Sequence, residues 1–146
     1  MISAIGPALT GLKAATTSVG VSASNIVNMR DSGNLASAQV SAADRVRLNA
    51  APPQPSEDLY RPLRADNIAV AGGGVRAVVQ EIDPPHVAEY DPADPSANED
   101  GVVARPNVDL ANELVNMTQA KTMFRANLKV IRTADDMMGA LLDSKV

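Results

Sequence analysis

The chain has 146 residues, a length that fits one domain with a modest core. Its net charge of −4 and the absence of any long run of Lys and Arg argue against a surface that binds nucleic acid. The chain contains no cysteine, which excludes disulfides and cysteine-based metal sites or nucleophiles. Only 2% of the residues are aromatic, so the apolar residues are mostly aliphatic and suit contacts between helices better than a thick globular core.

A helix is predicted near the start of the chain, over residues 5 to 29. Apolar residues recur there at steps of three and four, from Ile5 to Ile26, and Pro7 is tolerated because it lies in the first turn. Two internal glycines, Gly11 and Gly20, each cost about 1 kcal/mol relative to Ala in a helix. We therefore expect a helix of low intrinsic stability that gains order from partners, followed by a break at the turn-forming residues 28 to 34.

The first thirty residues contain no Asp or Glu, but they do not form a secretory signal. Such a signal needs an unbroken apolar stretch of roughly 7 to 15 residues behind a basic start, and Ser, Thr and Gly interrupt every apolar run here. No stretch approaches the roughly 20 apolar residues that span a membrane. The sequence predicts no membrane insertion, and it predicts that any export proceeds without cleavage, by a route that does not read a hydrophobic signal.

The middle of the chain, from about residue 35 to 107, holds nine of the ten prolines, so no long helix is expected there. Two short strands are predicted, at residues 67 to 71 and 75 to 82, because β-branched residues flank the glycine triplet at residues 72 to 74. The sequence thus predicts a small module built on a hairpin, with proline-rich connections to the helices.

Residues that could carry chemistry are few. The single histidine, His86, follows two prolines in a predicted loop, where a solvated residue is the favoured interpretation. No second histidine is available for a metal site, and no Gly-x-Ser-x-Gly sequence supports a nucleophile. The glycine triplet lacks the Lys-Ser/Thr that follows in a phosphate-binding loop. We expect no catalytic residue, cofactor or metal site, and we do not expect an enzyme.

Acidic residues gather between Glu89 and Asp100, which suggests calcium as one interpretation. An EF-hand loop started at Asp94 would place Glu99 where glycine is required and Arg105 where a bidentate Glu binds the ion. The favoured interpretation is a pair of Asp-Pro turns, at residues 91–92 and 94–95, with solvated carboxylates.

A second long helix is predicted from Asp109 to Leu142, about 51 Å at 1.5 Å per residue. Asn107 or Asp109 can cap its start, and Glu113 suits the positive end of the helix dipole. A basic run follows one side of this helix: Lys121, Arg125, Lys129 and Arg132. Two interpretations stay open for this run, a solvated helix face or a strip that meets the carboxylates of a neighbouring subunit.

The two predicted helices carry the same heptad pattern, with apolar residues that neither helix can bury alone. We therefore hypothesise that their apolar stripes form one assembly seam. The predicted seam consists of Leu9, Leu12, Val19, Ile26, Leu114, Met117, Phe124, Leu128, Ile131, Met138 and Leu142. The expected fold is α+β. Residues 1–30 and 108–146 form a helical coiled-coil layer in it, and residues 31–107 form a proline-rich segment of strands and loops.

Several sequence motifs resemble those of the axial proteins of the bacterial flagellum. The segment from Ser24 to Asn28 resembles the N-terminal Ser-x-Asn-Ile-Ala-Asn signature of that family, and the C-terminal stretch from Asn107 to Leu142 resembles the signature shared by rod and hook proteins. The segment from Tyr90 to Val108 resembles proximal-rod proteins of the FlgC type, and the short chain fits that type. The signature positions are Asn25, Asn28, Tyr90, Asp91, Pro92, Pro106, Asn107, Val108 and Asn127.

The resemblance implies a structural subunit of the flagellar basal-body rod, the drive shaft that transmits motor torque across the periplasm. It also implies export without a cleaved signal through the flagellar type III apparatus, followed by polymerisation with itself and other rod subunits. Two alternatives remain open, another short flagellar axial protein or a type III-secreted helical binding protein.

Overall fold

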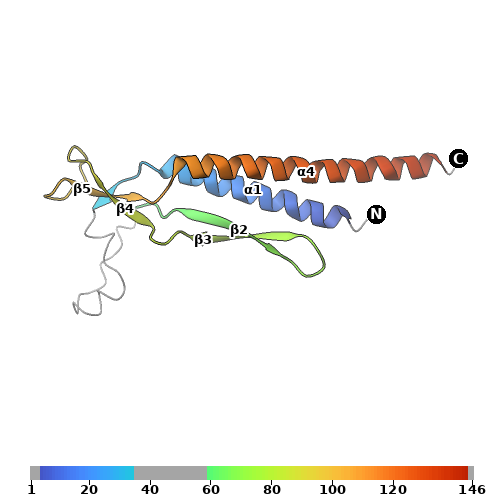
Figure 1. Ribbon diagram of the computed structural model, residues 1–146, viewed down its shortest axis with the longest axis horizontal. Coiled ribbons are helices and arrows are strands. Elements are labelled where there is room, and N and C mark those ends of the chain that lie inside the picture. Colours follow the sequence, from blue (N-terminus) through green and yellow to red (C-terminus); the bar gives the residue numbers. More distant parts are fainter. Residues whose placement is uncertain (1–3, 35–58, 145–146) are drawn as a thin grey trace. The chain divides into compact units, whose positions relative to one another are not determined.

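The computed structural model describes residues 4–34 and 59–144 (Figure 1). In chain order the elements are α1 (Ile5–Asn28), β1 (Gly33–Asn34), β2 (Leu63–Ala69), β3 (Val75–Glu81), β4 (His86–Tyr90), β5 (Val102–Pro106) and α4 (Leu110–Asp143). The protein is therefore α+β, as the sequence predicts. The described residues form two compact units. The helical unit contains residues up to Ala23, 63–80 and those from Ala111 onward, and the sheet unit contains the described parts of 24–62 and 81–110.

The helical unit is built on two long helices that run antiparallel and side by side, α1 and α4 (Figure 1). Both helices are confirmed, and their bounds agree with the predicted ones to within one residue at each end. Pro7 lies in the first turn of α1, where its missing N–H has no helical acceptor to lose. Asp109 directly precedes α4, in the position of a helix cap.

The same unit contains a hairpin of β2 and β3 around the glycine triplet. The predicted turn is confirmed, because Gly72, Gly73 and Gly74 all have φ between 92° and 99°, a region that L-residues rarely adopt. The amide of Val70 donates to the carbonyl of Gly74 at 3.1 Å. The first strand begins at Leu63 and ends at Ala69, earlier than predicted, since Ala71 belongs to the turn.

The sheet unit contains three antiparallel strands in the order β1-β5-β4, with β5 in the centre. The register pairs Gly33 with Ala104 on one side of β5 and Tyr90 with Val102 on the other. Val103 and Ala104, on the central strand, are fully buried. Central position in a sheet and complete burial make β5 the core of this unit.

The sequence reasoning did not predict this sheet, and it was wrong about His86. That residue is the first of β4 and is half-buried, not a solvated loop residue. Its Nε2 lies 3.1 Å from the carbonyl oxygen of Tyr60. Prolines precede β4 and end β5, and prolines normally argue against strands. They are tolerated here because they lie at the strand ends, where a missing N–H removes few ladder bonds.

Candidate assembly surface

The buried apolar residues of α1 and α4 are small. They are all alanines, each at most 4% exposed: Ala8, Ala14, Ala15, Ala120 and Ala134. Between them, Gly11 of α1 faces Asn127 of α4, and a Cβ built on Gly11 would lie 2.5 Å from Asn127 Nδ2. Small side chains let helix axes approach closely, because the distance between packed helices depends on the side chains at the contact. The two helices therefore meet along a line of small residues.

This buried line lies one residue before the predicted seam in both helices. In α1 the buried residues Ala8 and Gly11 precede the seam residues Leu9 and Leu12, and buried Ala15 precedes Thr16. In α4, Glu113 and Ala120 are buried at a spacing of seven, and Asn127 and Ala134 continue the same heptad position. A shift of one residue rotates a helix by about 100°, so the seam residues point to one side of the helix-to-helix contact.

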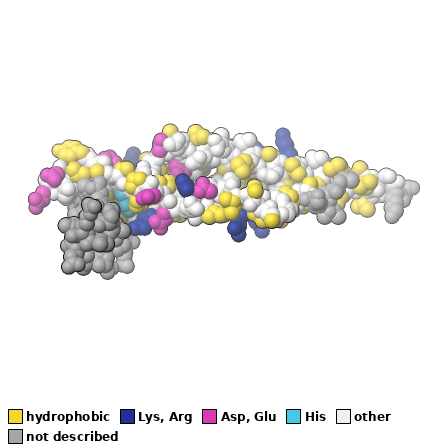
Figure 2. Space-filling view, turned by 60° about the horizontal axis from the view of Figure 1, so that its bottom comes forward, with side chains coloured by type: hydrophobic (Ala, Val, Ile, Leu, Met, Phe, Trp, Pro, Cys, Tyr) yellow, Lys and Arg dark blue, Asp and Glu magenta, His cyan; other side chains and the backbone are white. Residues whose placement is uncertain are grey.

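The large residues of the predicted seam thus remain accessible in the chain. Five of them are exposed: Leu9, Leu114, Phe124, Met138 and Leu142. The other six are half-buried: Leu12, Val19, Ile26, Met117, Leu128 and Ile131. Figure 2 shows hydrophobic side chains at the surface along the helical part of the molecule, on the right of that view. Large apolar residues that stay accessible along one side of a helix pair are typical of surfaces that contact other proteins.

Some of these residues line an open groove of about 770 Å³ between α1 and α4. Its lining residues are Ala15, Thr16 and Val19 of α1 and Leu114, Met117, Thr118, Lys121, Phe124, Arg125 and Leu128 of α4. We call this feature the α1–α4 groove. Along α4 it extends from Leu114 to Leu128, about 21 Å at 1.5 Å per residue.

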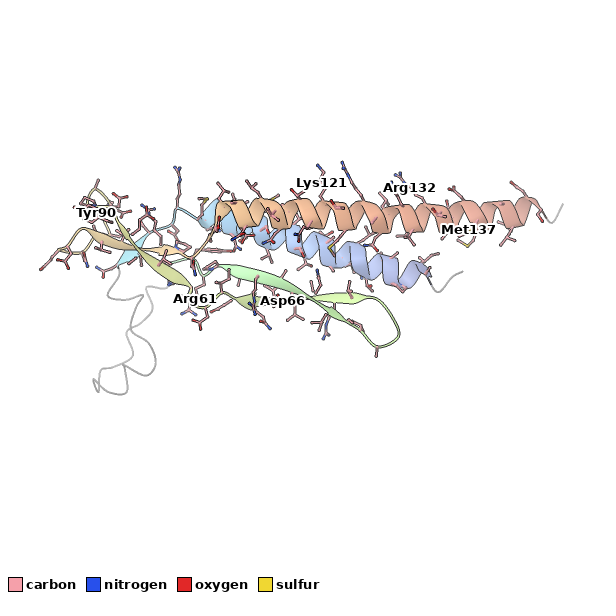
Figure 3. All side chains as sticks on the ribbon, viewed as in Figure 1. Arg61, Asp66, Tyr90, Lys121, Arg132 and Met137 are labelled. Atoms are coloured by element: carbon pink, nitrogen blue, oxygen red, sulfur yellow. The ribbon has the colours of Figure 1, made fainter. Side chains whose placement is uncertain are left out.

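The predicted basic run is exposed along α4. Lys121 and Arg132 project from the same side of the helix, whereas Met137 projects from the opposite side (Figure 3). No ion pair within the described part of the chain involves Lys121, Arg125, Lys129 or Arg132. The positive charge of this strip is therefore available to a partner.

One signature residue, Asn25, is completely buried in the sheet unit. Its Oδ1 accepts a hydrogen bond of 2.8 Å from the hydroxyl of Tyr60, which also lies 3.0 Å from Ser24 Oγ. The backbone amide of Tyr60 donates to Asp31 Oδ2 at 3.0 Å. A buried amide needs such partners because an unsatisfied polar group costs free energy. Asn25 therefore fixes residues 59–62 against the end of α1.

A second signature position, Asp91, belongs to an acidic cluster around Arg105. The Nη2 atom of Arg105 lies 2.8 Å from Asp91 Oδ2 and 3.9 Å from Asp94 Oδ2. Its Nε lies 3.0 Å from Glu89 Oε2, in a geometry that makes an ion pair rather than a hydrogen bond. The same guanidinium donates from Nη1 to the carbonyl of Arg30 at 3.2 Å. Arg105 thus pairs with three carboxylates and connects β5 to Arg30, two residues after the end of α1.

The two predicted Asp-Pro turns are confirmed, but the prediction that their carboxylates are simply solvated is wrong. The amides of Asp94 and Ala97 donate to the carbonyls three residues earlier, at 3.2 and 3.0 Å. Asp94 Oδ1 accepts a 2.8 Å hydrogen bond from the amide of Ser96. That bond and the hydroxyl of Ser32 lower the pKa of the Asp94 carboxyl and outweigh the opposing effect of desolvation, and the charge of Arg105 adds a smaller lowering.

The remaining signature residues lie in three places. Asn28 Nδ2 donates to the carbonyl of Ser24 in the last turn of α1, at 2.8 Å. Pro106 is buried at the end of β5, and Asn107 donates to the carbonyls of Pro84 and Pro85 at 3.0 and 2.9 Å. The exposed signature residues are Tyr90 and Pro92, and Val108 is half-buried.

The sequence did not predict the contacts of two residues that bind signature positions, Tyr60 and Arg105. Tyr60 is one of only two tyrosines, and its hydroxyl had to find a partner if buried, but nothing in the sequence indicates which one. The sequence did contain an indication for Arg105, because this residue occupies the position at which an EF-hand loop requires a Glu. A cation at that position indicates that the neighbouring carboxylates bind a guanidinium.

No group of three or more His, Asp and Glu residues in the described ranges has the arrangement to hold a metal ion. Within those ranges, none of the helices combines the length and the apolar character needed to cross a bilayer.

Comparisons with known proteins place these features in one family. A family model described as the C-terminal region of the flagellar basal body rod FlgEFG proteins matches residues 99–144, which include all of α4. The flagellar basal-body rod protein FlgC of Escherichia coli O6:H1 is 32% identical over 105 residues, which cover 72% of this chain and 78% of the relative. FlgC of Salmonella typhimurium is 33% identical over 105 residues, which also cover 72% of this chain and 78% of the relative. FlgC of Agrobacterium fabrum is 40% identical over 57 residues, 39% of this chain and 41% of the relative.

Proposed function

The chain belongs to the family of flagellar basal-body rod proteins FlgC, and from this premise we propose that it polymerises in the rod that transmits motor torque. Its partners in this role are further copies of itself and the other rod subunits. The observation that carries the proposal is the accessible strip of large apolar residues along α1 and α4, where the buried apolar residues are all alanines. A subunit that assembles must keep such a surface free until its neighbours cover it.

We further propose that α1 and α4 pair as a coiled-coil layer, residues 1–30 with 108–146, and that residues 31–107 form a proline-rich segment of strands and loops. The heptad spacing of Glu113, Ala120, Asn127 and Ala134 supports the coiled coil. In this role the protein is not an enzyme and needs no cofactor. Its work is mechanical and depends on packing between subunits.

Export is the step before assembly, and we propose that it occurs without a cleaved signal through the flagellar type III apparatus. The low helix propensity of residues 5–28, with two internal glycines and several β-branched residues, favours a segment that threads through a channel unfolded. Deletion of residues 1–29 should retain the protein in the cytoplasm. Secretion of the truncated chain at the wild-type level would refute a role of this segment in export.

The experiment that tests the function is deletion of the gene, followed by motility assays and electron microscopy of isolated basal bodies. The deletion strain should be non-motile and lack a complete rod, and the wild-type gene should restore both. A Leu128→Asp variant should be exported but fail to incorporate, because Leu128 lines the α1–α4 groove. A Lys13→Glu variant, altered at an exposed position outside the groove, is the control and should swim normally. A motile deletion strain would refute the proposal.

A further inference from the structure

The last part of α4 extends past the start of α1. The helices run antiparallel and Gly11 faces Asn127. Because α1 begins at Ile5, six residues before Gly11, its first residue lies beside α4 near residue 133, six residues after Asn127. Ala134 is the last buried residue of α4, and every residue from 135 to 143 is exposed. We call residues 135–143 the α4 tip. It presents four large apolar side chains to solvent: Met137, Met138, Leu141 and Leu142.

The apolar side chains of the tip have the spacing of a helix that docks in a groove. Met138, Leu141 and Leu142 stand at positions i, i+3 and i+4, the pattern by which one helix face anchors between two others. The α1–α4 groove offers a matching receptor. It is open, lined mainly by apolar side chains, and about four helical turns long, from Leu114 to Leu128. Its length and openness fit a helix better than a small molecule.

The charges of the two surfaces are opposite. The tip carries Asp135, Asp136 and Asp143 and no Lys or Arg, and the carboxyl end of a helix adds negative potential. The groove is lined by Lys121 and Arg125, which have no carboxylate partner in the described part of the chain. Acidic residues at a helix carboxyl end destabilise that helix by itself, so the tip gains from a basic partner.

We propose that the α4 tip of one copy docks in the α1–α4 groove of a second copy. The tip and the groove are different surfaces of the same unit, so the contact is heterologous and does not close on itself. It repeats from copy to copy and produces a linear array. Some 20 residues separate Lys121 from Leu141 along α4, so the centres of tip and groove lie about 30 Å apart at 1.5 Å per residue. The inference rests on the proposed function and names the surfaces through which it is carried out.

Disulfide cross-linking in isolated basal bodies tests the contact, and the chain suits it because it contains no cysteine. The test variant carries Thr118→Cys in the groove and Leu141→Cys in the tip. Within one chain these positions are about 35 Å apart along α4, too far for an intramolecular disulfide. Oxidation should therefore produce a ladder of dimers, trimers and larger oligomers. Either single variant should stay monomeric, because each copy then lacks one half of the contact.

The matched control pairs Leu141→Cys with Val130→Cys. Val130 is exposed on α4 but does not line the groove, so this pair should yield no ladder. A ladder of equal intensity from the control would overturn the proposal, since it would indicate chance collisions. Dimers from Leu141→Cys alone would also overturn it, because tips would then meet each other.

Charge reversal gives a second readout. Lys121→Glu with Arg125→Glu should lower the adduct yield about tenfold, and Asp135→Lys with Asp136→Lys in the same chain should restore most of it. Lys13→Glu, a single charge reversal outside the groove, should leave the yield unchanged. Basal bodies that contain the chain but give no adduct overturn this inference and leave the rod assignment standing. Basal bodies that lack the chain overturn both.

Discussion

Gly11 of α1 and Asn127 of α4 lie so close that no side chain fits between them. All three heavy atoms of the Asn127 carboxamide are 2.5–2.7 Å from the position that a Cβ on Gly11 would occupy. The carboxamide is itself held in place, because Nδ2 donates to the carbonyl of Met123 at 2.9 Å.

The first prediction follows from that contact. Gly11→Ala should destabilise the protein by about 1 kcal/mol, although alanine is the better helix former by about the same amount, because overpacking costs about 1–3 kcal/mol. Gly20→Ala is the matched control: nothing lies within 4 Å of its Cβ, and the variant should be more stable. Urea unfolding followed by circular dichroism measures both. Adding Asn127→Ala to Gly11→Ala should recover the loss, and a Gly11→Ala variant as stable as Gly20→Ala would contradict the close packing.

The second prediction concerns the buried hydrogen bond between Tyr60 and Asn25. Tyr60→Phe removes the donor to the Oδ1 of a completely buried amide and should lower the free energy of unfolding by about 1–2 kcal/mol. Tyr90→Phe removes the same hydroxyl from a side chain that is 73% exposed, and it should change the stability by less than about 0.5 kcal/mol. Thermal unfolding of the two variants compares them directly. Equal midpoints would show that the Tyr60 hydroxyl contributes nothing.

The third prediction is a pH dependence that originates at Asp94. Hydrogen bonds from Ser96 and Ser32 hold the pKa of its carboxyl below the ordinary 3.8, so the folded state binds its proton less tightly than the unfolded state. The resulting stabilisation is fully present above the ordinary pKa and is lost as the pH falls through the lower pKa of the folded state. In Asp94→Asn the free energy of unfolding should therefore fall less as the pH is lowered, as measured by denaturation curves at successive pH values. An equal fall in the variant and the wild type would assign the effect to other carboxylates.

The fourth prediction concerns Thr10, which connects α1 to the hairpin. Its Oγ1 accepts a 3.1 Å hydrogen bond from the amide of Val75 and donates to the carbonyl of Pro7 at 2.7 Å. Thr10→Val should therefore expose the Val75 amide to faster hydrogen exchange. In Thr17→Val, the control, the lost hydroxyl donates only to the carbonyl of Lys13 in its own helix. The Val75 amide should exchange there at the wild-type rate, and equal rates in the two variants would count against the contact.

Much of the secondary structure could be predicted because it depends on local chemistry. The ends of both helices follow from Pro7, from the turn residues after Asn28 and from the capping position of Asp109. The hairpin follows from three glycines between β-branched residues. The sheet of β1, β4 and β5 could not be predicted in this way, because β1 has only two residues and is 69 residues before its partner β5 in sequence, from Gly33 to Val102.

For the candidate site, the sequence by itself determined which large apolar residues need a partner, from Leu9 to Leu142, because a heptad pattern is a property of spacing alone. Only the tertiary structure decided which face of each helix is buried within the chain. That face is the one with glycine and alanine, since small side chains let two helices approach closely, as where Gly11 meets Asn127. A single stretch of sequence does not show which residues of another helix lie opposite it. The contact between the small residues leaves the larger residues, one position further along each helix, to line an open groove.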